Sequence, residues 1–246
     1  MRNILKSEFY KIKHTWLPWI HIILPCVYAI TFYGAAKITG LKNLGDISII
    51  QNYLVLLGGI LPIVCGILTS KVVDMEVNAG HFQVLLSTTT SRYKAYSGKL
   101  FALLIGFLLS TSLAIIIFGL LFGHQKPIEL LIELLLLFVG SLSIYMIHLW
   151  LSIILGGGAS IGLGFVGTLI ALLSMTNLGE KIWYFLPPTW PSRLSASYIV
   201  GSNLVDKSYL YHEIMMWSYV AIPTTIIIFT ASLVWFSRWD GKSLSD

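Results

Sequence analysis

Six long apolar runs fill most of this 246-residue chain, and the polar stretches between them are short. A helix needs ~20 mostly apolar residues to cross the hydrocarbon core of a bilayer. Charged residues make up 11% of the sequence, whereas a soluble domain carries about 25%. Because no polar stretch is long enough to fold alone, the sequence predicts an all-α polytopic membrane protein with six transmembrane helices in a single domain.

The predicted spans follow the limits of the apolar runs. They cover residues 16–36, 49–69, 100–122, 128–155, 159–175 and 216–236. The first run is longer than the ~7–15 residues of a signal-peptide core, so we interpret it as a span that the protein retains. Two connecting segments are long enough to hold structure of their own, and they comprise residues 70–99 and 177–215.

Residues 1–15 are predicted to form an amphipathic helix at the membrane interface. Leu5, Phe9 and Ile12 recur at helical spacing, and Lys6 falls on another face. Cations on such a helix lie close to anionic lipid headgroups, while the apolar face enters the interface. The alternative is a plain basic flank in which this periodicity is accidental.

Lys and Arg are more numerous on one side of the predicted spans than on the other. With the N-terminus inside, the cytoplasmic segments carry Arg2, Lys6, Lys11, Lys13, Lys71, Arg92, Lys94, Lys99, Arg238 and Lys242. The outer segments carry Lys37, Lys42, Lys126, Lys181, Arg193 and Lys207. Because cytoplasmic loops are enriched in Lys and Arg, both termini are predicted to be cytoplasmic. No basic cluster is dense enough to indicate a nucleic-acid partner.

The most informative pattern lies in residues 70–99, between the second and third predicted spans. Its residues of interest are, in order, Asp74, Glu76, Gly80, His81, Phe82, Leu85 and Arg92. The apolar members have the spacing of a short helix with one apolar face. A helix of this kind on the membrane surface fits a groove in a soluble partner. The alternative is an ordinary solvated connector.

This order of residues, with Gly98 and Lys99 opening the third span, resembles the membrane subunit of a type 2 ABC exporter. In that family the loop is a coupling helix that docks on the ATPase, so the resemblance implies a coupling role for the residues of this segment. It also implies an interfacial N-terminal helix, six spans and re-entrant outer helices, and it covers the whole chain. The implied partners are two copies of a separate ATPase, which bind ATP and Mg²⁺, and a second permease, identical or related. This chain itself is then expected to be no enzyme and to hold no cofactor.

Two further stretches resemble the permeases of lantibiotic self-immunity transporters. One is the start of the chain, from Ile4 to Lys11, and the other runs from Phe185 to Arg193 and contains Pro188 and Trp190. This resemblance implies that the protein lies in a bacterial plasma membrane and expels a cationic antimicrobial peptide. An exporter of another cargo, such as a lipid, a drug or a polysaccharide, is the alternative.

The outer segment 177–215 is rich in helix-breaking and aromatic residues. Its prolines interrupt any regular helix, and its Trp and Tyr rings favour the level of the lipid headgroups. We therefore expect it to lie on or dip into the outer leaflet, with Trp183, Trp190 and Arg193 as candidate substrate contacts. A plain aromatic belt that anchors the spans is the alternative.

Acidic residues within the predicted fourth span are further candidates for substrate handling. Glu129 and Glu133 lie four residues apart, on one helical face at the outer end of the span. Acids inside a membrane are costly and often functional, but Glu is also favoured near a helix N-terminus. These two residues and His148 are the groups on which an ion-coupled carrier, the rival to an ATP-driven exporter, would depend.

Glycine patterns in the chain do not indicate nucleotide binding. Gly162–Gly167 matches G-x-G-x-x-G, but it lies inside an apolar run and not in a βαβ unit. Tyr93 stands where a phosphate-binding loop ending at Gly98-Lys99 needs its first glycine. The spacing of Gly158 and Gly162 instead predicts close helix packing in the bilayer.

Overall fold

A computed structural model describes residues 2–80, 82–83, 91–123 and 126–241, which contain helices and no strand. The long helices are α1 (Arg2–Lys13), α2 (Leu17–Ile38), α3 (Asp46–Asn78), α5 (Arg92–Phe122), α6 (Pro127–Leu155), α7 (Gly157–Leu173), α8 (Trp190–Asn203) and α9 (Ser208–Arg238). Short 3₁₀ turns are η1 (Leu41–Leu44), η2 (Asn177–Gly179), η3 (Trp183–Phe185) and η4 (Pro187–Thr189). The predicted all-α membrane architecture is confirmed.

Five helices, α2, α3, α5, α6 and α9, are long and apolar enough to cross a membrane. The predicted span 159–175 corresponds to α7, an apolar helix of 17 residues, which at 1.5 Å per residue is ~25 Å long. The helices extend further than the apolar runs. Because α3 continues to Asn78 and α5 begins at Arg92, the predicted loop 70–99 reduces to a link over residues 79–91. Likewise, the last part of segment 177–215 belongs to α9, which begins at Ser208.

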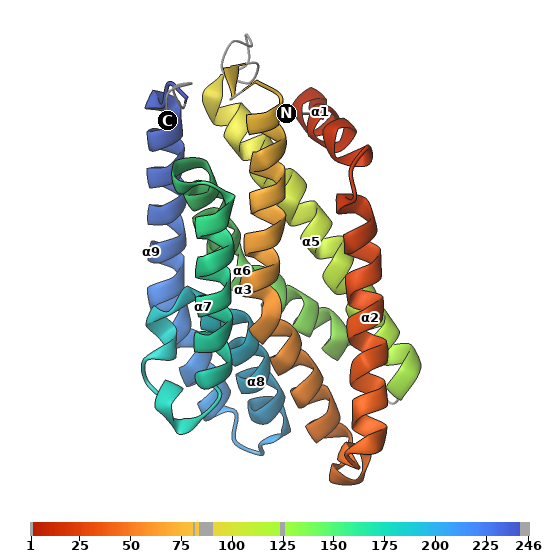
Figure 1. Cartoon of the computed structure of the whole chain (residues 1–246). Coiled ribbons are helices and arrows are strands. Elements are labelled where there is room, and N and C mark those ends of the chain that lie inside the picture. Colours follow the sequence, from red (N-terminus) through yellow and green to blue (C-terminus); the bar gives the residue numbers. More distant parts are fainter. Residues whose placement is uncertain (1, 81, 84–90, 124–125, 242–246) are drawn as a thin grey trace.

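The helices form an elongated bundle whose two ends differ (Figure 1). At the top of the figure lie α1, the C-terminal turn of α9, the end of α3 and the start of α5, and we call this the proximal end. The opposite, distal end carries η1 and α8. Consequently, the segments with the predicted coupling residues and both chain termini meet at one end of the bundle.

Small residues let α7 approach α3, which occupies the centre of the bundle. The buried face of α7 consists of Gly157, Ser160, Gly164, Gly167 and Ala171. A Cβ atom at Gly164 would lie 2.7 Å from the carbonyl oxygen of Pro62, so only glycine fits there. The predicted pair Gly158 and Gly162 is wrong, because a Cβ atom at either position would meet nothing within 4 Å. The close packing is real, but it uses the neighbouring face of the helix.

The first turn of α8 fits tightly against α3 and α6. A Cβ atom at Gly58 of α3 would lie 2.6 Å from the backbone nitrogen of Ser192, and one at Gly140 of α6 would lie 3.0 Å from that of Pro191. Trp183 and Trp190 are buried here, in an apolar cluster with Trp217 of α9. These two rings therefore pack inside the fold and do not face lipid, and their depth relative to the headgroups stays a prediction.

Candidate functional site

Four charged side chains from three helices form a buried network at the proximal end, which we call the proximal ion cluster. Lys99 of α5 donates hydrogen bonds to Glu8 of α1 (2.7 Å) and to Glu76 of α3 (2.8 Å). Lys11 of α1 donates to the same two carboxylates, at 2.9 Å and 2.7 Å. Glu8, Glu76 and Lys99 are each at most 5% exposed. The cluster thus joins the interfacial helix to the two helices that enter the link.

The local sequence explains how α1 reaches this position. Gly98 has no side chain where α1 packs, and a Cβ atom there would collide with Ile4. The next residue, Lys99, then extends between the two carboxylates. The Gly98-Lys99 pair therefore makes room for α1 and holds it in place, a role that its place at the start of a span does not reveal.

The charges of the cluster balance, with two carboxylates against two ammonium groups. Burial by itself lowers the pKa of Lys11, but the hydrogen bond to Glu76 and the attraction of Glu8 outweigh it and raise the pKa. Leaving a buried charge without its partner typically costs about 3–5 kcal/mol. Each member therefore depends on the others remaining in place.

A second set of contacts fixes the other side of the link to α9. Arg92, the first residue of α5, donates to the carbonyl oxygens of Ser237 (3.2 Å) and Trp239 (2.8 Å). It also pairs with the carboxylate of Asp240 at 3.2 Å. Phe82 is 2% exposed, and its ring centroid lies 4.9 Å from that of Trp239. The link is thus attached to the C-terminal turn at two points.

The backbone at Phe82 supports this attachment. Its φ of 68° lies in the left-handed region, which costs an L-residue about 1–2 kcal/mol. Burial of the ring against Trp239 offsets that cost. Just before it, Gly80 has φ 116°, a conformation that suits glycine and turns the chain away from α3.

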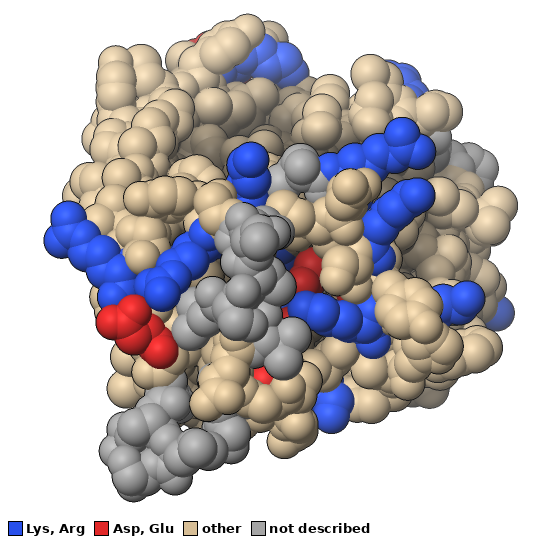
Figure 2. All heavy atoms as spheres, turned by 90° about the horizontal axis from the view of Figure 1, so that it is seen from above, with Lys and Arg blue, Asp and Glu red and all other residues tan. Residues whose placement is uncertain are grey.

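The other predicted coupling residues have different surroundings. The hydroxyl of Ser70 donates to Asp74 at 3.5 Å, and a Cβ atom at Gly157 would lie 3.2 Å from Oδ1 of Asp74, so this carboxylate lies beside the start of α7. His81 and Leu85 lie outside the residues that the structure describes. Figure 2 shows this end of the molecule face on, with Lys and Arg side chains spread over it and Asp and Glu visible in few places.

At the distal end, the two predicted acids of α6 line one hollow. We call it the distal hollow; it has an empty volume of about 800 Å³, open to solvent. It is lined by Asp46, Ile47, Ile50, Lys126, Glu129, Glu133, Tyr198, Ile199, Ser202 and Asn203. Trp183, Trp190 and Arg193 are not among its lining residues, and Arg193 instead donates to the carbonyl oxygen of Thr176 at 3.3 Å. The distal hollow therefore contains only two of the predicted substrate residues, Glu129 and Glu133, while Trp183 and Trp190 share the buried apolar cluster.

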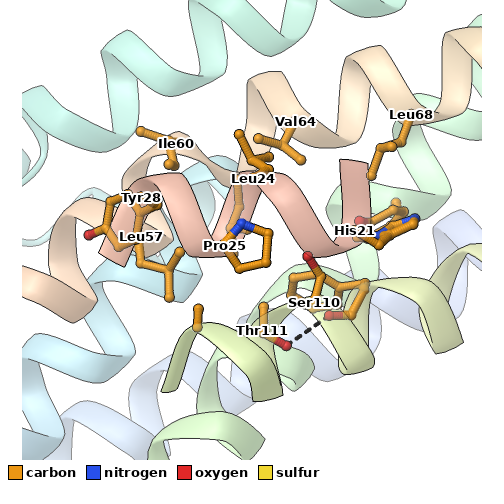
Figure 3. A pocket seen from close by; sticks show the side chains of 14 residues that line it. His21, Leu24, Pro25, Tyr28, Leu57, Ile60, Val64, Leu68, Ser110 and Thr111 are labelled. Carbon is orange, nitrogen blue, oxygen red and sulfur yellow. Dashed lines mark hydrogen bonds between the residues drawn. The ribbon is translucent and has the colours of Figure 1, made fainter. Parts of the chain in front are cut away.

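A second hollow of about 420 Å³ lies between α2, α3 and α5 (Figure 3). Its walls are mostly apolar side chains, such as Leu24, Leu57 and Val64, and no Asp, Glu, Lys or Arg lines it. His21 and Thr111 are among its few polar groups, and the Thr111 hydroxyl donates to the carbonyl of Phe107 at 2.8 Å. This hollow therefore offers a cation or an anion no charged partner.

His148, which an ion-coupled carrier would need, takes part in a buried network of hydroxyls. Its Nδ1 lies 2.9 Å from the hydroxyl of Ser160, which in turn lies 3.1 Å from that of Thr69. Ser152 donates to Thr69 at 3.3 Å. These bonds tie α6, α7 and α3 together, which is the structural use of a neutral histidine.

The short helix α1, joined by ions to a bundle of long apolar helices, is typical of a polytopic membrane protein. A family model described as ABC-2 family transporter protein matches residues 4–171. The chain therefore belongs to this family of ABC transporter membrane proteins, whose membership implies association with an ABC ATPase subunit. Comparisons with curated proteins and with solved structures gave no match. The matched residues include the whole proximal ion cluster and all three acids of the distal hollow.

Proposed function

We propose that this chain is the permease subunit of an ABC exporter and that a separate ATPase docks on the link over residues 79–91. The observation that carries this proposal is the attachment of both sides of the link. On one side, α3 is held to α1 and α5 through Glu76. On the other, Arg92 and Phe82 are held to the C-terminal turn of α9.

Attachment of this kind matters because a loose loop would absorb a push from a partner. In this protein the residues that flank the link are bonded to α1, α3, α5 and α9. Displacement of the link therefore shifts these helices together. Packed helices move between discrete arrangements as rigid bodies. Because α3 also packs against α8 at the distal end, the same movement reaches the distal hollow.

The basic face shown in Figure 2 supports placing the proximal end in the cytoplasm. In this orientation the link faces the compartment that supplies ATP. We propose that two copies of the ATPase bind ATP and Mg²⁺ and that a second permease, identical or related, completes the transporter in a bacterial plasma membrane.

We further propose that the cargo is a cationic antimicrobial peptide of the lantibiotic type. The resemblance of the chain start and of the stretch around Pro188 and Trp190 to self-immunity permeases supports this cargo. The acids of the distal hollow also favour a cationic molecule over a neutral one. An exporter of another class of cargo would protect cells against a different compound in the experiment that follows.

Replacing Arg92 by alanine is expected to weaken export without preventing membrane insertion. The change removes the bonds to Ser237, Trp239 and Asp240. Movement of the link is then transmitted less well to α9. Coupling changes of this kind are typically worth about 0.5–2 kcal/mol, or roughly two- to thirtyfold. The measurement is the inhibitory concentration of a lantibiotic for cells that express this chain with its ATPase.

The matched control is Lys94→Ala, which removes an exposed cation from the same end of α5. It is expected to leave resistance close to that of the unchanged chain. Equal resistance in the Arg92→Ala cells at equal membrane abundance would exclude the role given to Arg92. Protection by the unchanged chain against a drug but not against the peptide would replace the proposed cargo.

A further inference from the structure

We propose that the distal hollow is a binding site for a primary ammonium group, such as a lysine side chain, and that the carboxyl group of Glu133 receives it. This inference deepens the proposed function by naming the chemical group of the cargo that is recognised. It depends on that function for the biological source of the ammonium group. Binding itself requires neither the ATPase nor transport.

The first argument is the isolation of Glu133. The residue is 1% exposed, and neither carboxylate oxygen has a hydrogen-bond partner within the described part of the chain. The Ser195 hydroxyl, the polar group beside it, is likewise buried without a partner at hydrogen-bond geometry in the described part of the chain. Burial of a polar group without a partner is costly, and of a charged one more so. A ligand that supplies donors would remove this cost.

The second argument is the charge of the surrounding walls. Asp46 at the start of α3 and Glu129 one helical turn before Glu133 add two more carboxyl groups. Lys126 is the one cation among the residues that line the hollow, and it lies 3.5 Å from Glu129. Its side chain is 77% exposed, so it sits at the rim. The acids therefore outnumber the base, and the most buried acid, Glu133, has no ion-pair or hydrogen-bond partner among the described residues.

The third argument concerns the shape and donors of the ligand. Tyr198, Ser202 and Asn203 of α8 add oxygens that can accept hydrogen bonds. An ammonium group has three donors on a slender flexible stem, whereas a guanidinium is a wide planar fork. Because the target is a single recessed carboxylate, the compact group fits it better. No set of three close His, Cys, Asp or Glu residues for a metal ion occurs in the described ranges.

The test uses the full chain in lipid nanodiscs, without ATPase, and n-hexylammonium as the probe. Its neutral match is 1-hexanol, and empty nanodiscs correct for partition into lipid. Saturation-transfer NMR measures the dissociation constant of each probe. We expect hexylammonium to bind to the unchanged chain and its affinity to fall about tenfold or more in Glu133→Gln, since bonds to charged groups contribute about 1.5–3 kcal/mol.

Two further variants keep the result decisive. Glu129→Gln changes an acid that is 41% exposed, so it perturbs packing less, and it is expected to weaken binding by a smaller factor. Glu180→Gln removes an exposed acid outside the hollow and is expected to change nothing. Equal affinity of the unchanged chain for hexylammonium and hexanol, or equal loss in Glu129→Gln and Glu180→Gln, would overturn the proposal.

Failure of the ammonium site can be distinguished from failure of the proposed exporter function. Failure of the probe to bind would leave docking of an ATPase on the link untouched. Conversely, a chain that binds hexylammonium but no ATPase would keep the ammonium site and remove the exporter mechanism.

Discussion

Lys99→Met is expected to release α1 from the bundle and to destabilise the protein by about 3–5 kcal/mol, the usual cost of leaving buried charges unpaired. Lys99 is 2% exposed and bridges Glu8 and Glu76, so without it two buried carboxylates share Lys11 alone. The measurement is thermal or denaturant unfolding in nanodiscs, combined with protease cleavage after Lys13, where α1 ends.

The control is Lys94→Met, which makes the same change at an exposed position of the same helix. It is expected to alter stability by less than about 0.5 kcal/mol. A further variant, Lys99→Met with Glu76→Gln, removes one charge of each sign and is expected to recover part of the loss. If Lys99→Met and Lys94→Met unfold alike, the cluster does not hold α1 in the way described here.

Gly58→Ala is expected to displace α8 and to destabilise the protein by about 1–3 kcal/mol, the range for overpacked cores. The added methyl group would lie 2.6 Å from the backbone nitrogen and 2.8 Å from the Cα of Ser192, and backbone atoms have no rotamer with which to move away. The change should also raise the accessibility of Trp190, now 1% exposed. Tryptophan fluorescence quenching and the unfolding temperature measure both effects.

Gly162→Ala is the matched control for this prediction. It makes the same substitution inside a helix, where alanine is favoured over glycine by about 1 kcal/mol, but its Cβ atom meets nothing within 4 Å. The control is therefore expected to be neutral or slightly stabilising. A Gly58→Ala protein as stable as Gly162→Ala would show that α8 does not depend on this close approach.

The number and type of helices could be predicted because each span must satisfy the same requirement of about 20 apolar residues. The ends of the helices were harder to predict, since hydropathy marks where a helix leaves the hydrocarbon core and not where its backbone hydrogen bonds stop. For this reason α3 extends past residue 69 to Asn78, and α5 begins before residue 100. The face of α7 that packs on α3 was also missed, because several glycine spacings in 156–167 satisfy the small-residue pattern equally well.

The proximal ion cluster was beyond prediction from one sequence. Glu8 looks like one acid in a basic amphipathic helix, and Lys99 looks like a flanking cation at a span end. Glu8 and Lys99 are 91 positions apart in the sequence, and only the fold shows that their side chains are directly bonded. Glu76 was predicted from its segment to act in coupling, and its buried position suggests that it does so through α1 and α5. That role, like those of Asp74, Gly80, Phe82 and Arg92, stays a prediction.

The sequence correctly predicted that Glu129 and Glu133 are neighbours, because a spacing of four places them on one face of a helix. The other residues that line the hollow could not be predicted, since residues such as Asp46 and Tyr198 come from distant parts of the chain. The burial of Trp183 and Trp190 was not predicted, because composition indicates an interfacial segment without indicating which of its rings turn inward.

Docking of an ATPase on the link is tested most directly by photo-crosslinking in membranes that contain both proteins. A benzophenone amino acid replaces Gln83, an exposed residue of the link, or Val205, an exposed residue between α8 and α9 at the distal end. We predict that the Gln83 probe crosslinks to the ATPase and that the Val205 probe does not. Crosslinking from Val205 alone, or from neither site while the two proteins remain active together, would contradict the account.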